Sequence, residues 1–415
     1  MKDYVPMSVI PSIFADKWAS LLNGDKMTKI YDNNLSVYIH YPFCRQKCAF
    51  CQIATIQYNS EMGSSYVSLL TREIIQRKEI LSSHSIDCIH FGGGTPSLMD
   101  AQDVEDILKT INKYTNIKES EIVFEAHPFY MSDNFLSCLS NFDNCTINFG
   151  VQSFDDAVLT SVNRNYKTSE ILKRIEWAKS KVRAIGIDII CDLPNSTQDT
   201  LKNDIKHISM LQSDHISLYP LIIQNTPMTK NEKYLKNCKN IILNIDEKID
   251  INTSCAQMLS DLGYNRYSIY HYEKEGILTH IYGRNQINNG KWIGFGSKAY
   301  TYLGDITYIN TSIENYMKGF YIHKKVEMNF TDRLIWELSF LIRRYPLNQD
   351  EIYIKYGIIL KPYIEKIIAE LVKKDFMTSK NNLELTWKGV MNITLIEQII
   401  KEVMSSKISV AEWSL

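Results

Sequence analysis

The chain has 415 residues, of which 45% are hydrophobic and 22% charged, and its formal net charge is −1. This length suits one large domain of barrel size together with one small domain. The balanced charge gives no basic field that would indicate nucleic acid or an anionic membrane as a partner. No apolar run reaches the ~20 residues that span a bilayer, and the N-terminus lacks the apolar core of a secretion signal. We therefore expect a cytoplasmic protein with no nucleic-acid partner and no membrane span.

Strand-like and helical runs alternate after a leader of 34 residues, at the spacing of βα units. The expected strands cover residues 36–40, 87–91, 121–125, 146–151, 184–190 and 215–221. The expected helices cover residues 65–79, 101–114, 169–180, 197–211 and 245–262. Repeated βα units form a parallel sheet, which helices cover on both faces or close into a barrel.

The chain changes character near Met328. Helical patterns cover residues 330–344, 349–357 and 362–374, and a hairpin is expected over 376–389, about Asn381 and Asn382. Three helices and a hairpin indicate a winged-helix-like accessory domain, but its lysines form no dense patch of the kind that binds DNA. The sequence thus predicts a leader (1–34), a barrel with a substrate-side extension (35–327) and a mainly helical C-terminal domain (328–415).

Three cysteines, Cys44, Cys48 and Cys51, lie in a short loop after the first expected strand, with the spacing C-x3-C-x2-C. A four-iron cluster normally takes four cysteines, so three would leave one iron open to bind a small molecule. A zinc site is the first alternative, although it would need further ligands at a suitable spacing. A disulfide with one odd thiol is the second. The nine cysteines of the chain are odd in number and scattered, which favours a reducing compartment.

Polar and glycine residues gather where the expected strands end, which is the edge where parallel α/β folds place their active sites. The run Gly92–Gly94 would let the backbone approach a ligand closely. Glu125 ends the third strand, either in a binding pocket or as an exposed charge. Gln152 and Asp188 lie within apolar strands, where a carboxylate is costly unless it is paired or hydrogen-bonded. Sugar hydroxyls, a lysine or a backbone turn are its natural partners.

Three further side chains are candidates for the same site. Phe50 precedes the third cysteine and offers an aromatic face for adenine, or packs the loop. Arg164 would clamp a carboxylate with two hydrogen bonds, or is an ordinary surface arginine. His127 is a proton-transfer group or a core histidine, and we favour the core histidine.

Four segments together resemble the radical S-adenosylmethionine (SAM) proteins. They are Tyr38 to Cys51, His90-Phe-Gly-Gly-Gly-Thr-Pro96, Gly150-Val-Gln-Ser-Phe154 and Asp188-Ile-Ile-Cys-Asp-Leu-Pro194. More narrowly, they resemble the oxygen-independent coproporphyrinogen oxidase-like family. The resemblance runs from about residue 36 to 303, and the segment from Met328 is similar to the C-terminal domain of that family.

The resemblance implies an α/β fold, a partial six-stranded (β/α) barrel, with a [4Fe-4S] cluster on Cys44, Cys48 and Cys51. An electron from a donor such as flavodoxin or ferredoxin would pass through the cluster to SAM, giving methionine and a 5′-deoxyadenosyl radical. Tyr38 and Glu125 would be the catalytic residues, with Tyr38 beside the cluster. The implied cofactor-binding residues are Phe50, Gly92, Gly93 and Gly94 (at the methionine amino group), Thr95, Glu125, Gln152 and Asp188 (at the ribose) and Arg164 (at the carboxylate).

Departures from the family pattern separate three functions. Coproporphyrinogen oxidases carry a fourth cysteine two residues after the third, where this chain has Ile53. Haem chaperones carry a His-Asn-x-x-Tyr-Trp segment, and residues 282–292 have no histidine in the matching place, although His280 is near. Class C radical methyltransferases use a second SAM as carbon donor, and residues 292–300 resemble their substrate-side segment. We therefore predict methylation or alkylation of a small-molecule or natural-product substrate, with haem-chaperone-like binding or coproporphyrinogen oxidation as alternatives.

Overall fold

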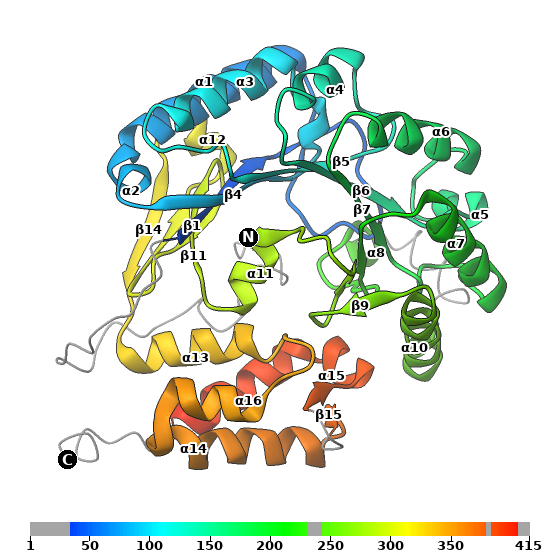
Figure 1. The fold of residues 1–415 in the computed structure, drawn as a ribbon, viewed down its shortest axis with the longest axis vertical. Helices are drawn as coiled ribbons and strands as arrows, with labels where there is room; N and C mark the ends of the chain where they lie inside the picture. Colours follow the sequence, from blue (N-terminus) through cyan, green and yellow to red (C-terminus); the bar gives the residue numbers. More distant parts are fainter. Residues whose placement is uncertain (1–33, 231–242, 379–382, 406–415) are drawn as a thin grey trace.

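A computed structural model describes residues 34–230, 243–378 and 383–405. The expected leader lies outside the described residues, except for Asn34. Twelve strands form the main sheet, in the order β14-β13-β12-β11-β1-β4-β5-β6-β7-β8-β10-β9. Figure 1 shows that this sheet is strongly curved, with most helices on its outer side.

The six expected strands are present, lie side by side in chain order and are parallel. They are β1 (Asn34–Tyr41), β4 (Ser85–Gly93), β5 (Glu121–Ala126), β6 (Cys145–Gln152), β7 (Ala184–Ile189) and β8 (His215–Leu218). A seventh parallel strand, β11 (Lys291–Phe295), pairs with the free side of β1 and was not predicted. The carboxyl ends of these strands therefore meet at one edge, as expected for this fold.

Antiparallel strands extend the sheet on both sides. Beyond β8 lie β10 (His271–Lys274) and β9 (Tyr264–Arg266), and beyond β11 lie β12 (Tyr300–Tyr302), β13 (Ile306–Asn310) and β14 (Ile322–Glu327). Among the described residues, β14 and β9 are the two edges, so the sheet does not close on itself. The fold is a partial barrel, as predicted.

Helices connect the strands close to the predicted positions. The structure has α3 (Ala101–Asn112), α6 (Thr168–Lys179), α7 (Gln198–Leu211) and α10 (Ile245–Asp261), and it divides the first expected helix into α1 (Ser60–Gln76) and α2 (Lys78–Ser82). Two short helices were missed, α4 (Asp133–Leu139) and α5 (Asp156–Ser161), which begin at the side-chain caps Ser132 and Asp155. The short α8 (Pro227–Lys230) and α12 (Ile313–Tyr316) lie in later connections, and α11 (Ile281–Ile287) lies on the inner side of the curved sheet (Figure 1).

A buried carboxylate ties α1 to the β11–β13 side of the sheet. Glu73 is fully buried and accepts hydrogen bonds from the backbone N of Gly296 (2.9 Å), Asn310 Nδ2 (2.8 Å) and the Tyr316 hydroxyl (2.8 Å). It also pairs with Arg77, whose Nη1 lies 3.1 Å away. A buried charge of this kind is tolerated because every partner is present.

We expect Glu73→Ala to lower the free energy of unfolding by about 3–5 kcal/mol, because it removes the counter-charge of Arg77 and leaves several buried donors without their acceptor. Urea unfolding at pH 7 measures the change. Glu61→Ala on the exposed face of the same helix is the control and should cost no more than about 0.5 kcal/mol. Equal free energies of unfolding for the two variants would show that the Glu73 hydrogen bonds contribute little to stability.

The C-terminal segment forms α13 (Phe330–Leu341), α14 (Gln349–Lys373), α15 (Trp387–Met391) and α16 (Ile393–Ser405). The prediction of two helices over 349–374 was wrong, because α14 continues through Pro362. An interior proline costs about 3 kcal/mol. The buried side chains Leu360, Ile364 and Ile367 join the core that includes α16, and this packing outweighs the cost.

The expected hairpin is present as β15 (Met377–Thr378) and β16 (Glu384–Leu385), with Met377 opposite Leu385. Its turn, with Asn381 and Asn382, lies outside the described residues. None of the helices in the described parts of the chain is long and apolar enough to cross a membrane.

Candidate functional site

Two short parallel strands close the base of the cysteine loop. Strand β2 (Phe43–Cys44) follows β1 and pairs with β3 (Ile56–Gln57). The backbone N of Ile56 donates to Pro42 O, and that of Tyr58 donates to Cys44 O, both at 2.9 Å. The thiols of Cys44, Cys48 and Cys51 are free and half-buried.

The segment after α5 holds the middle of the loop. The backbone N of Ala49 donates to Val162 O at 3.0 Å. Asn163 Nδ2 donates to Lys47 O (2.8 Å), and Gln46 Nε2 donates back to Asn163 O (2.9 Å). Asn163 has a φ of 62°, a left-handed conformation that asparagine tolerates. The loop is therefore fixed by residues more than a hundred positions away.

Two of the cysteine sulfurs accept hydrogen bonds from buried side chains at the strand ends. Thr95 Oγ1 lies 3.3 Å from Cys44 Sγ, and Arg164 Nη1 lies 3.4 Å from Cys48 Sγ. Thr95 is 6% exposed and Arg164 is 5% exposed. Arg164 Nη2 also donates to the carbonyl oxygen of Gly150 on β6. Arg164 is therefore not an ordinary surface arginine, and its assignment to a SAM site stays a prediction.

Burial raises the pKa of the Cys44 thiol to about 11, and it also raises the pKa of Cys51. The neighbouring Cys48 raises the pKa of both thiols further, a smaller effect than burial. In the described parts of the chain, no group of three or more His, Cys, Asp or Glu side chains is arranged around a single metal ion. A four-iron cluster does not need that arrangement, because each thiolate binds a different iron. Three free thiols in one loop fit such a cluster, which would displace their protons on binding.

The glycine turn at the end of β4 packs tightly against the loop and against Glu125. A Cβ on Gly94 would lie 2.6 Å from Phe43 O, and a Cβ on Gly92 would lie 2.7 Å from Glu125 Oε1. Gly93 has a φ of 108°, and its backbone N donates to Glu125 Oε2 at 3.2 Å. Glycine is required here because no side chain fits between β2 and the end of β5.

Glu125 remains accessible, whereas Tyr38 is held in a stack of rings. The Glu125 side chain is 39% exposed, and His90 Nε2 donates to its Oε1 at 3.0 Å. The rings of Tyr38, His90 and Tyr282 pack mutually, with the Tyr38 centroid 5.9 Å from that of His90 and 5.5 Å from that of Tyr282, and the Tyr38 hydroxyl lies 3.1 Å from His40 Nδ1. Burial raises the pKa of Tyr38 well above its usual value, so its hydroxyl is neutral.

Gln152 and Asp188 face the same end of the barrel. Gln152 ends β6 with a φ of 78° and is buried. Asp188 on β7 lies opposite Gly150. Burial raises the pKa of Asp188 to about 7, a hydrogen bond with Ser217 opposes this rise, and the charge of Glu125 adds to it. Asp188 and Glu125 therefore share one electrostatic environment.

Two other predicted residues take packing positions. Phe50 is half-buried against a small hydrophobic cluster that includes Val162. The ring of His127 stacks on Tyr130, with centroids 4.4 Å apart, and its Nδ1 accepts from the backbone N of Phe129 at 3.2 Å. Burial lowers the pKa of His127 well below its usual value. His127 is half-buried among these rings, and the charge of Arg164 lowers its pKa further.

A buried histidine cluster on the inner side of the sheet was missed. The ring of His280 lies 4.5 Å from that of His271 and 5.0 Å from that of His215. The Tyr267 hydroxyl joins His215 Nε2 (3.0 Å) to His280 Nδ1 (3.3 Å). Burial lowers the pKa of all three histidines. Their scattered positions carry no spacing signal in the sequence.

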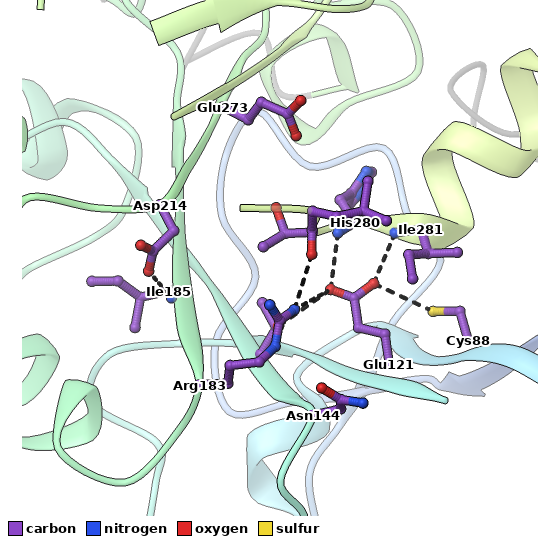
Figure 2. Close-up of polar contacts among 12 residues, drawn as sticks. Cys88, Glu121, Asn144, Arg183, Ile185, Asp214, Glu273, His280 and Ile281 are labelled. Atoms are coloured by element: carbon purple, nitrogen blue, oxygen red, sulfur yellow. Dashed lines mark hydrogen bonds and ion pairs between the residues drawn. The ribbon is translucent and has the colours of Figure 1, made fainter. Parts of the chain in front are cut away.

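The start of α11 is fixed at the opposite end of β5 from Glu125. Figure 2 shows Glu121, the first residue of β5, accepting from the backbone N of His280 (3.0 Å) and of Ile281 (2.8 Å). Arg183 Nη2 lies 3.5 Å from the same carboxylate, and Cys88 Sγ donates to it at 3.8 Å. Helix α11 is thus anchored at the strand starts, and His280 is only 9% exposed.

Five of the predicted site residues lie together at the carboxyl ends of the parallel strands: Cys44, Thr95, Glu125, Asp188 and Arg164. The structure places His280 and Glu121 at the starts of those strands instead. The backbone of His280 is thus fixed at the strand starts, while its ring reaches His90, with centroids 5.8 Å apart, and His90 in turn donates to Glu125.

Comparisons with known proteins agree with this geometry. A model of the radical SAM superfamily matches residues 38–208. The heme chaperone HemW of Buchnera aphidicola (subsp. Schizaphis graminum) is 26% identical over 88% of this chain and 98% of its own length. The oxygen-independent coproporphyrinogen III oxidase of Pseudomonas aeruginosa is 24% identical over 81% of this chain and 78% of its own length.

The solved structure of coproporphyrinogen III oxidase (HemN) from Escherichia coli shares the fold. It superposes with a TM-score of 0.74 at 21% identity, and covers 89% of this chain and 90% of that protein. The superfamily match spans β1 to α7, which carry every candidate residue of the strand-end site, and the relatives named here match 81–89% of the chain. Residues 38–208 therefore match a radical SAM domain, and the chain is similar over most of its length to HemN- and HemW-like proteins.

Proposed function

We propose that this chain is a haem-carrying radical SAM protein, with a [4Fe-4S] cluster on Cys44, Cys48 and Cys51 and SAM at the adjoining strand ends. The match to a radical SAM domain implies the cluster and SAM. The observation that carries the assignment to these residues is the pair of hydrogen bonds from Thr95 and Arg164 to cysteine sulfurs. These bonds join the cysteine loop directly to the strand-end residues.

The residues around the loop have suitable chemistry for SAM. Backbone groups of the Gly92–Gly94 turn would meet its amino group. Arg164, beside Cys48, would pair with its carboxylate, since a guanidinium matches a carboxylate with two hydrogen bonds. Asp188 and Gln152 would bind the ribose hydroxyls, and Phe50 would pack against the adenine. When bound, a reduced cluster would supply the electron that cleaves SAM, and the chain would position the reactants and exclude water.

Haem binding is supported by the relatives rather than by one residue. The Buchnera protein that matches this chain over nearly its whole length is named a heme chaperone. The methylation or alkylation that we predicted from the sequence has no counterpart in the relatives named above, and neither has a second SAM. Coproporphyrinogen oxidation is the second candidate, on the likeness to the Pseudomonas enzyme. Ile53, in place of a fourth cysteine, speaks against it.

His280 does not serve as the haem ligand in this conformation. Its ring packs on His215 and His271, and its backbone is bound to Glu121. An iron–porphyrin could reach the ring only if the histidine cluster opened. We therefore expect haem uptake that survives His280→Ala.

Haem titration tests the proposal. The full chain, with its cluster reconstituted anaerobically, is titrated with haem and followed by the Soret band, and His280→Ala is measured beside it. We expect about one haem per chain for both proteins, as a single-site carrier requires. A parallel incubation supplies methyl-labelled SAM and a reductant such as reduced flavodoxin or ferredoxin.

The outcomes separate the candidates. Stoichiometric haem uptake without transfer of label supports a carrier. Absence of saturable haem uptake contradicts the carrier, and conversion of coproporphyrinogen III would then assign the oxidase. Label that leaves SAM and appears in a product would restore the methylation hypothesis.

A further inference from the structure

Two side chains that the sequence assigns to SAM also contact the cysteine sulfurs. Thr95 Oγ1 and Arg164 Nη1 are within hydrogen-bond distance of Cys44 and Cys48, respectively. We infer that Thr95 and Arg164 set the reduction potential of the cluster through these bonds. The inference rests on the proposed cluster, and it gives two residues of the site a role that does not depend on SAM.

Thr95 is held in place by the backbone around it. Its own N donates to Phe43 O at 2.8 Å, one residue before Cys44, and the N of Gly94 donates to Tyr41 O at 2.7 Å. The short helix η2 (Pro96–Leu98) follows directly. These backbone bonds hold Thr95 next to β2, and its hydroxyl lies 3.3 Å from Cys44 Sγ.

Arg164 is fixed just as firmly. Its backbone N donates to Leu159 O at 2.9 Å, and its Nη2 donates to Gly150 O. The side chain is buried, and its Nε has no hydrogen-bond partner among the described residues. The guanidinium thus carries a full positive charge beside Cys48, in a place where water does not screen it.

Both contacts favour the reduced cluster. One electron taken from the donor changes [4Fe-4S]²⁺ to [4Fe-4S]⁺, so the cluster and its thiolates gain one negative charge and no bond is made or broken. Hydrogen bonds to the cysteine sulfurs, and a nearby positive charge, stabilise that added charge. Removing either contact should therefore make the reduction potential more negative.

A redox titration of the SAM-free protein measures this effect. The full chain is reconstituted anaerobically, and the reduced cluster is quantified by EPR at controlled potentials. Thr95→Val keeps the shape of the side chain and removes the hydroxyl, whereas Thr95→Ser keeps the hydroxyl. At the wild-type midpoint we expect the ratio of reduced to oxidised cluster to fall about tenfold in Thr95→Val, a shift of about 59 mV. Thr95→Ser should stay at the wild-type value.

Arg164 variants separate charge from hydrogen bonding. Arg164→Lys keeps the charge and loses the planar fork, whereas Arg164→Met loses both. We expect a larger negative shift for Arg164→Met than for Arg164→Lys. Iron content and circular dichroism verify that each variant is loaded and folded, and Thr95→Ala takes the place of Thr95→Val if that variant loads poorly.

The results distinguish this inference from the proposed function. A loaded wild-type cluster whose potential is unchanged in the Thr95 and Arg164 variants overturns the inference and leaves the cluster assignment intact. A wild-type chain that binds no four-iron cluster overturns the proposed function itself. A negative shift that Thr95→Ser does not share supports the inference.

Discussion

Cys48→Ala is expected to remove the iron–sulfur cluster completely. With two thiols left in the loop, a four-iron cluster would have two irons without a protein ligand, and such a cluster is not retained. Iron should fall from about four atoms per chain to below the level of stoichiometric binding, and the visible absorption should disappear. Anaerobic reconstitution followed by iron and sulfide analysis makes the measurement.

A buried cysteine outside the loop gives the matched control. Cys138 on α4 is 4% exposed and donates to Ala101 O at 3.6 Å. Cys138→Ala should cost about 1 kcal/mol of stability and keep the full iron content. If Cys48→Ala retains wild-type iron, the proposed ligand set is wrong.

Gly94→Ala is expected to disrupt the site from the side of the glycine turn. The added Cβ would lie 2.6 Å from Phe43 O and 2.9 Å from both Phe43 N and the carbonyl carbon of Pro42. These are backbone atoms of the segment that leads into Cys44, so they cannot move as the end of a side chain can. We expect a loss of about 3 kcal/mol in the free energy of unfolding, typical of overpacking, together with a large loss of iron.

Gly276→Ala separates this effect from the general cost of replacing a glycine. Gly276 has a φ of 82°, and a Cβ there would meet nothing within 4 Å. Backbone strain alone should cost about 1–2 kcal/mol and leave the cluster in place. Urea unfolding and iron analysis are applied to both variants. A Gly94→Ala protein with wild-type iron would contradict the tight junction between the turn and the loop.

The parallel strands were predictable because each is a short apolar run next to a helical pattern. Strand β11 was missed because it does not follow the regular alternation of strands and helices. It also contains Gly294 and pairs with β1, which is far away in the sequence. Gly294 itself reflects tertiary structure, since a Cβ there would collide with the backbone of Tyr300. Such a contact leaves no trace in local periodicity.

The C-terminal error has a similar cause. A proline usually ends a helix, so the sequence pattern alone favours a break before Pro362. Helix α14 continues because the buried side chains on both sides of the proline pack into one core. Local propensity is a weak guide where tertiary packing supplies more free energy.

The site was predicted better than its contacts were. Cysteine spacing and the glycine turn are local signals, so Cys44, Cys48, Cys51 and Gly92–Gly94 could be selected from the sequence. The partners of Thr95 and Arg164 could not be selected, because each bond joins residues from distant elements. The cluster of His215, His271 and His280 was not predicted, because these histidines also come from separate elements.

The long-range pairing around β1 has a consequence for how the protein matures. The strand that leads into the cysteines borders β11, and the cysteine loop is tied to Val162 and Asn163. During translation, Val162, Asn163 and β11 are synthesised after the three cysteines. The nascent chain therefore passes through a stage in which the cysteines are exposed and lack these contacts. The fully supported loop therefore forms only after β11 has been made, and oxygen that reaches the thiols before then can oxidise them.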